Sequence, residues 1–124
     1  MRLASIAFFL LVPGLASAQP ANSDCSTAAL LCAQQGVAGN NTGANGPVPA
    51  FCQPGGNQVW YTFTTNSQGG AVTASVNGIN CPAVGGMDDE LSVAVLSGSA
   101  TCNPALFSAV SACASDNQGF SVST

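Results

Sequence analysis

Residues 59–65 read Val-Trp-Tyr-Thr-Phe-Thr-Thr, and this stretch decides the class of fold. On an extended chain Val59, Tyr61 and Phe63 fall on one face, while Trp60 and two threonines fall on the other. A period of two residues is typical of a strand with one buried face. We therefore predict a strand over residues 59–65, with Tyr61 and Phe63 facing the core.

The same alternation recurs along the rest of the chain. It is found in residues 71–77, 91–96, 106–114 and, as a further strand, 118–124. Stretches rich in Gly, Asn, Ser and Pro separate these segments, as expected of turns. Strong helix formers such as Glu, Lys and Arg are nearly absent. The pattern predicts an all-β protein, an antiparallel β-sandwich or jelly roll.

The N-terminal segment has the features of a secretory signal. Arg2 precedes an apolar run over residues 3–15, and Ala16-Ser17-Ala18 offers the small residues that signal peptidase accepts. The run is too short to span a membrane comfortably. We predict a signal peptide over residues 1–18 and a secreted module over residues 19–124, without a membrane segment after cleavage.

Two conformations are open for the first part of the module. Asp24 or Ser26 could cap a short helix through residues 28–31, with Gly36 ending it. The alternative is an extended segment around Leu30. Residues 36–58, which are rich in Gly, Asn and Pro, predict a long loop.

All six cysteines lie after the signal. An even count in an exported chain predicts disulfides. Cys102 and Cys113 flank a short excursion and are the first pair expected; Cys32 with Cys52 and Cys25 with Cys81 follow by elimination. The module is therefore expected to be stabilised by disulfides.

Charge excludes several functions. The chain has one basic residue, Arg2 in the signal, and no histidine, so the module is purely acidic. Binding of nucleic acid or anionic lipid requires cations that the module lacks. Catalysis by Ser-His-Asp, Cys-His or lysine is impossible within the chain for the same reason. We predict that the module is not an enzyme.

The acidic residues suggest a calcium site. Calcium prefers oxygen ligands, and carboxylate and amide side chains from two loops could meet at one end of the sandwich. The candidates are Asp88, Asp89, Glu90, Asp116 and Asn117. The alternatives are an exposed acidic loop, or a carboxylate-based hydrolase in which Asp88 and Glu90 project together. Ca²⁺ is the only cofactor that the sequence suggests.

Trp60 is the candidate ligand-binding residue. It lies opposite the predicted core face, and an aromatic ring can stack on a sugar. The alternative is that Trp60 covers the second side of the sheet. The partner expected from this reading is a glycan or a cell-surface protein.

The motifs occur in a recognisable order. They are Asp24-Cys25-Ser26, the Gly-Asn-rich residues 39–43, Cys52, the strand 59–64, the acids and aliphatic strand over 89–98, and Cys102 to Cys113 with Asp116. This order resembles the secreted bacterial β-sandwich modules called pre-peptidase C-terminal domains, and CUB-like jelly rolls. The resemblance implies an extended segment around Leu30.

The resemblance also implies a function. Such modules are appended to larger exported proteins and do non-catalytic work in adhesion, ligand binding or spacing. In the family a final strand closes the sheet after the region that corresponds to 118–124, so we expect this chain to be part of a longer protein. The expected function is an extracellular binding, adhesion or accessory module, with a structural spacer as the alternative.

Overall fold

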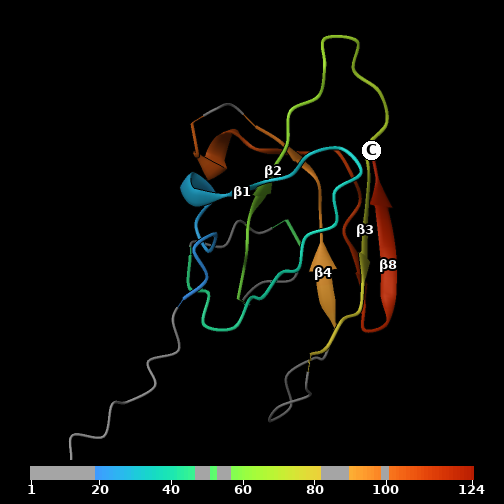
Figure 1. Cartoon of the computed structure of the whole chain (residues 1–124). Coiled ribbons are helices and arrows are strands. Elements are labelled where there is room, and N and C mark those ends of the chain that lie inside the picture. Colours follow the sequence, from blue (N-terminus) through green and yellow to red (C-terminus); the bar gives the residue numbers. More distant parts are fainter. Residues whose placement is uncertain (1–18, 47–50, 53–56, 82–89, 99–100) are drawn as a thin grey trace, which may run out of the picture.

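Short stretches of alternating sequence pair into small sheets in this protein (Figure 1). The computed structural model describes residues 19–46, 51–52, 57–81, 90–98 and 101–124. The predicted signal peptide, residues 1–18, and Asp88 and Asp89 lie outside these residues. The elements are the 3-10 helices η1 (Cys25–Thr27) and η2 (Pro104–Leu106) and the strands β1 (Ala29–Leu30), β2 (Tyr61–Thr62), β3 (Thr73–Asn77), β4 (Leu91–Val93), β5 (Leu96–Ser97), β6 (Ser108–Ala109), β7 (Ala114–Asp116) and β8 (Gly119–Ser123).

The strands form four two-stranded sheets. The pairs β3–β8, β4–β7 and β5–β6 are antiparallel, whereas β1–β2 is parallel. The all-β prediction is confirmed, because the described residues contain strands and short 3-10 turns but no α-helix. They show no closed sandwich. No helix in the described ranges has the length and apolar character needed to cross a membrane.

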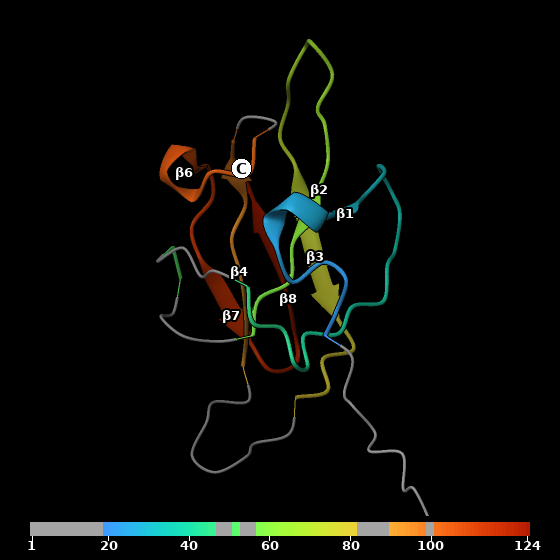
Figure 2. The ribbon, with the colours of Figure 1, turned by 90° about the vertical axis from the view of Figure 1, so that its left-hand side faces the viewer.

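The pair β3–β8 is the most regular sheet (Figure 2). Its two strands are in register over five residue pairs. The inner face carries Val76 and Val122, and Val122 is only 4% exposed. The outer face carries hydroxyls that bond across the sheet, including Ser75 to Ser121 at 2.8 Å. Both predicted alternations, over residues 71–77 and 118–124, are therefore confirmed. The last strand, β8, pairs with β3.

The predicted strand over residues 91–96 is divided in two. β4 pairs with β7 and β5 with β6, and Val95 lies buried between them. The Val95 carbonyl accepts from the amides of Val110 at 3.0 Å and Ser111 at 3.4 Å. The Val95 amide donates to the Ser111 hydroxyl at 2.8 Å. The Val95 carbonyl thus accepts from two amides, and the Val95 amide bonds to a side chain where a ladder would give it a backbone carbonyl. This arrangement interrupts the ladder as a β-bulge does.

The predicted strand over residues 106–114 is also interrupted, at its start and between β6 and β7. Asn103 accepts a hydrogen bond from the Ala105 amide at 3.1 Å, and Pro104 follows at the first helical position, so a 3-10 turn forms. Leu106 ends this turn and is 59% exposed. The chain is regular again only in β6 and β7, on either side of Ser111.

The N-terminal part is extended after one turn. The Asp24 carboxylate caps η1 by accepting from the Ser26 amide at 2.8 Å. The chain then enters β1, where Ala29 and Leu30 pair with β2. The helix option for residues 28–31 is wrong, and the extended alternative is confirmed.

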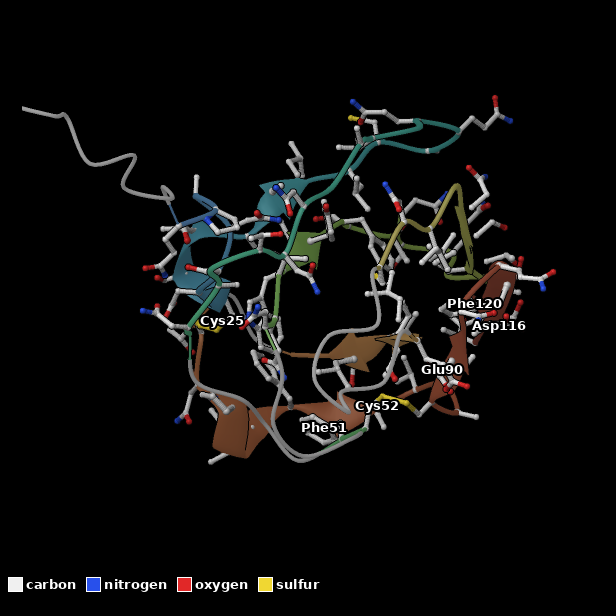
Figure 3. The ribbon with its side chains drawn as sticks, turned by 90° about the horizontal axis from the view of Figure 1, so that it is seen from below. Cys25, Phe51, Cys52, Glu90, Asp116 and Phe120 are labelled. Atoms are coloured by element: carbon white, nitrogen blue, oxygen red, sulfur yellow. A yellow bond between two sulfur atoms is a disulfide. The ribbon has the colours of Figure 1, made fainter. Side chains whose placement is uncertain are left out.

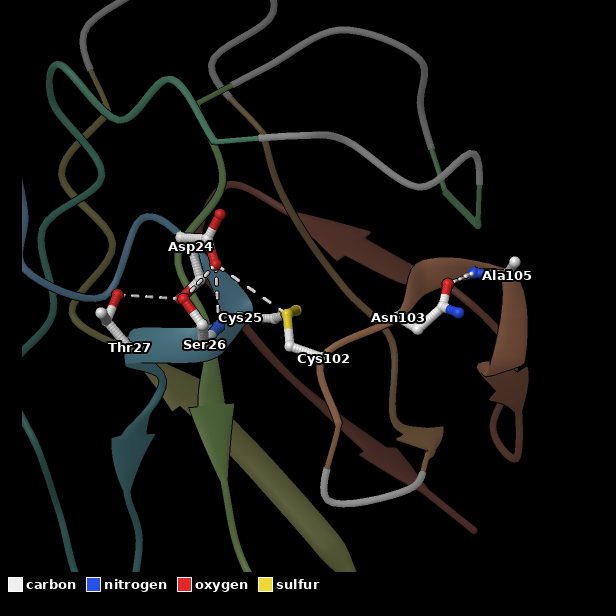
Figure 4. Close-up of a disulfide and its surroundings, with 7 residues drawn as sticks. All are labelled: Asp24, Cys25, Ser26, Thr27, Cys102, Asn103 and Ala105. Carbon is white, nitrogen blue, oxygen red and sulfur yellow. Dashed lines mark hydrogen bonds between the residues drawn. A yellow bond between two sulfur atoms is a disulfide. The ribbon is translucent and has the colours of Figure 1, made fainter.

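The disulfides join partners far apart in sequence, and Figure 4 shows one of them, Cys25–Cys102. Cys25 is bonded to Cys102, and Cys52 to Cys113, with Cα atoms 5.7 and 5.6 Å apart. Cys32 and Cys81 are free. All three predicted pairings are therefore wrong. The reason is that η2 and β6 lie between Cys102 and Cys113 in the sequence. Cys102 therefore reaches Cys25 in η1, whereas Cys113 reaches Cys52.

Candidate functional site

A groove lies beside β2 and β5, and its lining includes Thr124 and residues of the loop between β2 and β3. Figure 1 shows that this loop and the C-terminus lie at the same end of the molecule. Its volume is about 350 Å³, which is within the usual range for ligand pockets. Most of the lining comes from β2 and the residues after it and from β5 and Gly98. The lining residues are Tyr61, Thr62, Phe63, Thr65, Gly70, Val72, Leu96, Ser97, Gly98, Val110 and Thr124.

Aromatic and aliphatic side chains give the groove its apolar surface. Phe63 is 37% exposed and Val110 is 44% exposed. The prediction that Phe63 faces the core is therefore wrong, whereas Tyr61 is half-buried. The strand pairing of β2 ends at Thr62, so the two-residue alternation no longer directs Phe63 inward.

Gly39 positions Tyr61 in the groove wall. A methyl group at Gly39 would overlap the Tyr61 hydroxyl, so the loop can approach the ring only because residue 39 has no side chain. The sequence contained no signal for this contact, because Gly39 lies in a Gly-Asn-rich loop far from residue 61.

The polar groups of the groove are hydroxyls. Four come from Thr62, Thr65, Ser97 and Thr124, and a fifth from Tyr61. No Asp, Glu, Lys, Arg or His is among the lining residues. An apolar surface with a few hydroxyls can hold an uncharged ligand through contact area and hydrogen bonds.

Trp60, the predicted ligand-binding residue, does not line the groove. Its ring packs against Phe107, with centroids 5.7 Å apart and planes at 43°. Phe107 in turn lies over Gly98, where a side chain would overlap the ring. The backbone of Trp60 is held by Asn22, whose carbonyl accepts from the Trp60 amide at 2.8 Å. This packing matches the alternative reading, in which Trp60 covers the second side of the sheet.

The indole nitrogen of Trp60 is a further feature of this packing. Trp60 Nε1 and Gln58 Oε1 are buried and have no hydrogen-bond partner among the described residues. A buried donor or acceptor without a partner costs free energy. They lie outside the lining of the groove.

Part of the predicted calcium set meets at one end of the molecule. In the β4–β7 register Leu91 is opposite Asp116, which brings the preceding residue, Glu90, close to Asp116 (Figure 3). Asn117 is next in the chain. The Asp116 carboxylate accepts from the Gln118 amide at 2.9 Å, which shapes the turn into β8. Asp88 and Asp89 lie outside the described residues, so the calcium site stays a prediction.

One group of three potential metal ligands is close together within the described ranges. Single atoms of Asp24, Cys25 and Cys102 all lie within 4.8 Å of one another (Figure 4). The two sulfurs are bonded to each other, so neither can act as a thiolate ligand. Asp24 Oδ1 lies 3.9 Å from Cys102 Sγ, and this sulfur has no hydrogen to donate.

Asp24 has a structural part in this group. Its carboxylate accepts from the Ser26 hydroxyl at 2.6 Å and from the Ser26 amide at 2.8 Å. These hydrogen bonds, the hydroxyl first, lower the pKa of Asp24 below its ordinary value. The ionised form therefore caps η1 beside the disulfide.

Comparisons with protein-family models, curated proteins and solved structures give no match to this chain. The resemblance to secreted β-sandwich modules therefore rests on the order of the motifs. The chemistry of the groove is the basis on which a function can be argued.

Proposed function

We propose that this chain is a non-catalytic binding module of an exported bacterial protein, and that it holds an uncharged ligand in the groove beside β2 and β5. The observation that carries the proposal is the lining, which combines exposed Phe63 and Val110 with hydroxyl groups and has no charged side chain. The partner is a neutral glycan or a segment of a cell-surface protein, and secretion through the signal over residues 1–18 delivers the module to it.

The chemistry of the chain supports a binding role over catalysis. The module has neither histidine nor lysine to act as a base or nucleophile. Glu90 and Asp116 lie together, but away from the groove lining. A ligand in the groove would therefore meet no group that transfers protons at neutral pH.

The fold in this proposal is the β-sandwich that the alternation predicts. β7 and β8 lie in contact, which would join the β4–β7 and β3–β8 pairs into one layer. The pairs β1–β2 and β5–β6, which flank the groove, would then belong to the second layer. Calcium at Glu90, Asp116 and Asn117 would stabilise the turn between β7 and β8.

Binding arrays test the proposal. Arrays of neutral glycans and of extended peptides are probed with the full chain, with and without calcium. We expect binding to at least one array. Phe63→Ser should weaken it about tenfold or more, whereas Leu106→Ser, which removes a side chain that is 59% exposed and outside the groove, should leave it unchanged.

Two results would reject this function. Absence of binding to both arrays would favour the spacer role. Equal binding by wild type and Phe63→Ser would place the ligand elsewhere on the molecule. Circular dichroism of both variants checks that each is folded.

A further inference from the structure

A carboxylate lies beside the disulfide that joins η1 to the segment before η2 (Figure 4). Asp24 Oδ1 is 3.9 Å from Cys102 Sγ, and single atoms of Asp24, Cys25 and Cys102 all lie within 4.8 Å of one another. Within the described ranges, no carboxylate forms such a group with the two sulfurs of Cys52–Cys113. The two disulfides therefore differ in their electrostatic surroundings.

The carboxylate beside Cys25–Cys102 is held in place and charged. Its oxygen accepts from the hydroxyl and the amide of Ser26, and these hydrogen bonds lower the pKa of Asp24 below its ordinary value. The module has no basic side chain that could neutralise it, because the only Lys or Arg of the chain is Arg2 in the signal. Cys25 and Cys102 are both half-buried, so a small reductant can approach the sulfurs beside this charge.

Reduction of a disulfide brings negative charge to its sulfurs. A thiolate bonds to one sulfur, the S–S bond breaks, and the electron pair leaves on the other sulfur as a thiolate. A second small thiolate then attacks the mixed disulfide, which releases the remaining cysteine and leaves the reductant as its own disulfide. Whichever of Cys25 and Cys102 is attacked first, the leaving sulfur gains its charge within 4.8 Å of the Asp24 carboxylate.

We propose that the Asp24 carboxylate protects the Cys25–Cys102 disulfide from reduction by thiolates, and most strongly from small thiols that carry a further negative charge. Two like charges about 4 Å apart in water repel each other enough to slow a reaction about fivefold. This property goes beyond the proposed function. It preserves the disulfide that closes the longer of the two loops, with 77 residues of separation against 61 for Cys52–Cys113.

Reduction of the oxidised full chain by three small thiols tests the inference. The thiolate of cysteamine is zwitterionic, that of 2-mercaptoethanol is singly negative, and that of thioglycolate is doubly negative. Each is used at the same thiolate concentration, at low salt and without calcium, and alkylation followed by mass spectrometry gives the rate at each disulfide. We expect Asp24→Asn to speed the reduction of Cys25–Cys102 about fivefold with 2-mercaptoethanol, more with thioglycolate and less with cysteamine.

Asp116→Asn is the matched control. The Asp116 carboxylate accepts from the amide two residues further on, at 2.9 Å, just as the Asp24 carboxylate accepts from the Ser26 amide. The same change from carboxylate to amide is thus made in the same local setting, but at a residue that is not grouped with Cys25 and Cys102. Asp116→Asn should leave the rate at Cys25–Cys102 unchanged with all three thiols.

A measurement on the wild type needs no variant. Salt at about 1 M screens charges over a few ångströms, so it should speed the reduction of Cys25–Cys102 by thioglycolate more than by cysteamine. The same relative change with both thiols would contradict a role for charge at this disulfide.

Three results with Asp24→Asn would overturn the inference. Equal rates for wild type and variant would show that the carboxylate gives no protection. An acceleration of the same size with all three thiols would show that the substitution loosens η1 instead of removing a repelling charge. Equal acceleration at Cys25–Cys102 and Cys52–Cys113 would show that the variant opens the whole module.

Discussion

The β3–β8 sheet and the region around η1 and η2 are stabilised in different ways. β3 and β8 pair over five residues, carry no cysteine and place Val122 in the interior. The other region consists of 3-10 turns and strands of two or three residues, and both disulfides have a partner there or next to it. The continuous hydrogen-bond ladder of β3–β8 is stable without a disulfide. The short elements of the other region bury too little surface to stabilise each other, so they depend on the disulfides.

The thin interior explains why the cross-links matter. Among the described residues the buried apolar side chains are Ala44, Val95 and Val122, and none of them is large. Without basic residues in the module, ion pairs between side chains cannot add to stability. Each disulfide closes a long loop, with 77 residues of separation for Cys25–Cys102 and 61 for Cys52–Cys113. Loops of this length imply a large entropic effect on the unfolded chain.

The largest effect is expected from removing the cross-links. Replacing Cys25 and Cys102 together by serine should lower the free energy of unfolding by about 4 kcal/mol, because the unfolded chain regains the entropy of an open loop. Urea denaturation followed by circular dichroism measures the change. Replacing Cys32 or Cys81 should change it by less than about 1 kcal/mol, because both are free.

Peptide mapping of the oxidised protein checks the same point. A fragment that joins Cys25 to Cys102 is expected. A fragment that joins Cys102 to Cys113 would support the pairing predicted from sequence and would contradict the difference drawn between the two regions.

The sequence predicted the two regions unequally, and residue interactions explain why. Over 71–77 and 118–124 the outward side chains bond to each other, as Thr73 does to Ser123, so nothing competes with the ladder. Over 91–114, Asn103 and Ser111 bond to the backbone instead. The alternation of residues within a segment does not show whether a side chain will replace a backbone partner in the ladder. That depends on which segments come together in the fold.

The groove was missed for a related reason. Phe63 was expected in the core, yet it is exposed. Of the two readings for Trp60, ligand binding or covering the second side of the sheet, its packing on Phe107 matches the second. Alternation assigns faces only while a strand continues, and β2 ends at Thr62. Residues 96–98 also line the groove, and their proximity to β2 depends on long-range packing. The sequence suggested that an acidic residue among 88–90 could meet Asp116, and the β4–β7 register brings Glu90 close to it; the calcium role stays a prediction.

The interior of the regular sheet should give the next largest effect. Val122→Ala should lower the free energy of unfolding by about 2 kcal/mol, because it removes two methyl groups from a side chain that is 4% exposed. Val110→Ala is the matched control; Val110 is 44% exposed, and its change should be below about 0.5 kcal/mol. Thermal unfolding compares the two. Equal losses would show that β3–β8 does not depend on its buried face.

A smaller effect should separate the two kinds of hydroxyl. Ser111→Ala leaves the amide of buried Val95 without the hydroxyl that it bonds at 2.8 Å, and should cost about 1 kcal/mol. Ser121→Ala removes one of two exposed hydroxyls that bond to each other, and should cost about 0.3 kcal/mol. The same loss in both variants, measured by urea denaturation, would mean that the interruption at Val95 does not depend on Ser111.

The smallest effect concerns the pH dependence of the cap at η1. The pKa of Asp24 is lowered from 3.8 by its hydrogen bonds to Ser26, so the folded chain favours the ionised carboxylate. Its contribution to stability is therefore complete above the ordinary pKa and is lost as the pH falls through the lowered one. Asp24→Asn keeps an acceptor for the Ser26 amide but cannot ionise. The difference in melting temperature between wild type and Asp24→Asn should accordingly shrink or change sign between pH 6 and about pH 2. A difference that stays constant over this interval would mean that the Asp24 charge does not contribute to the cap.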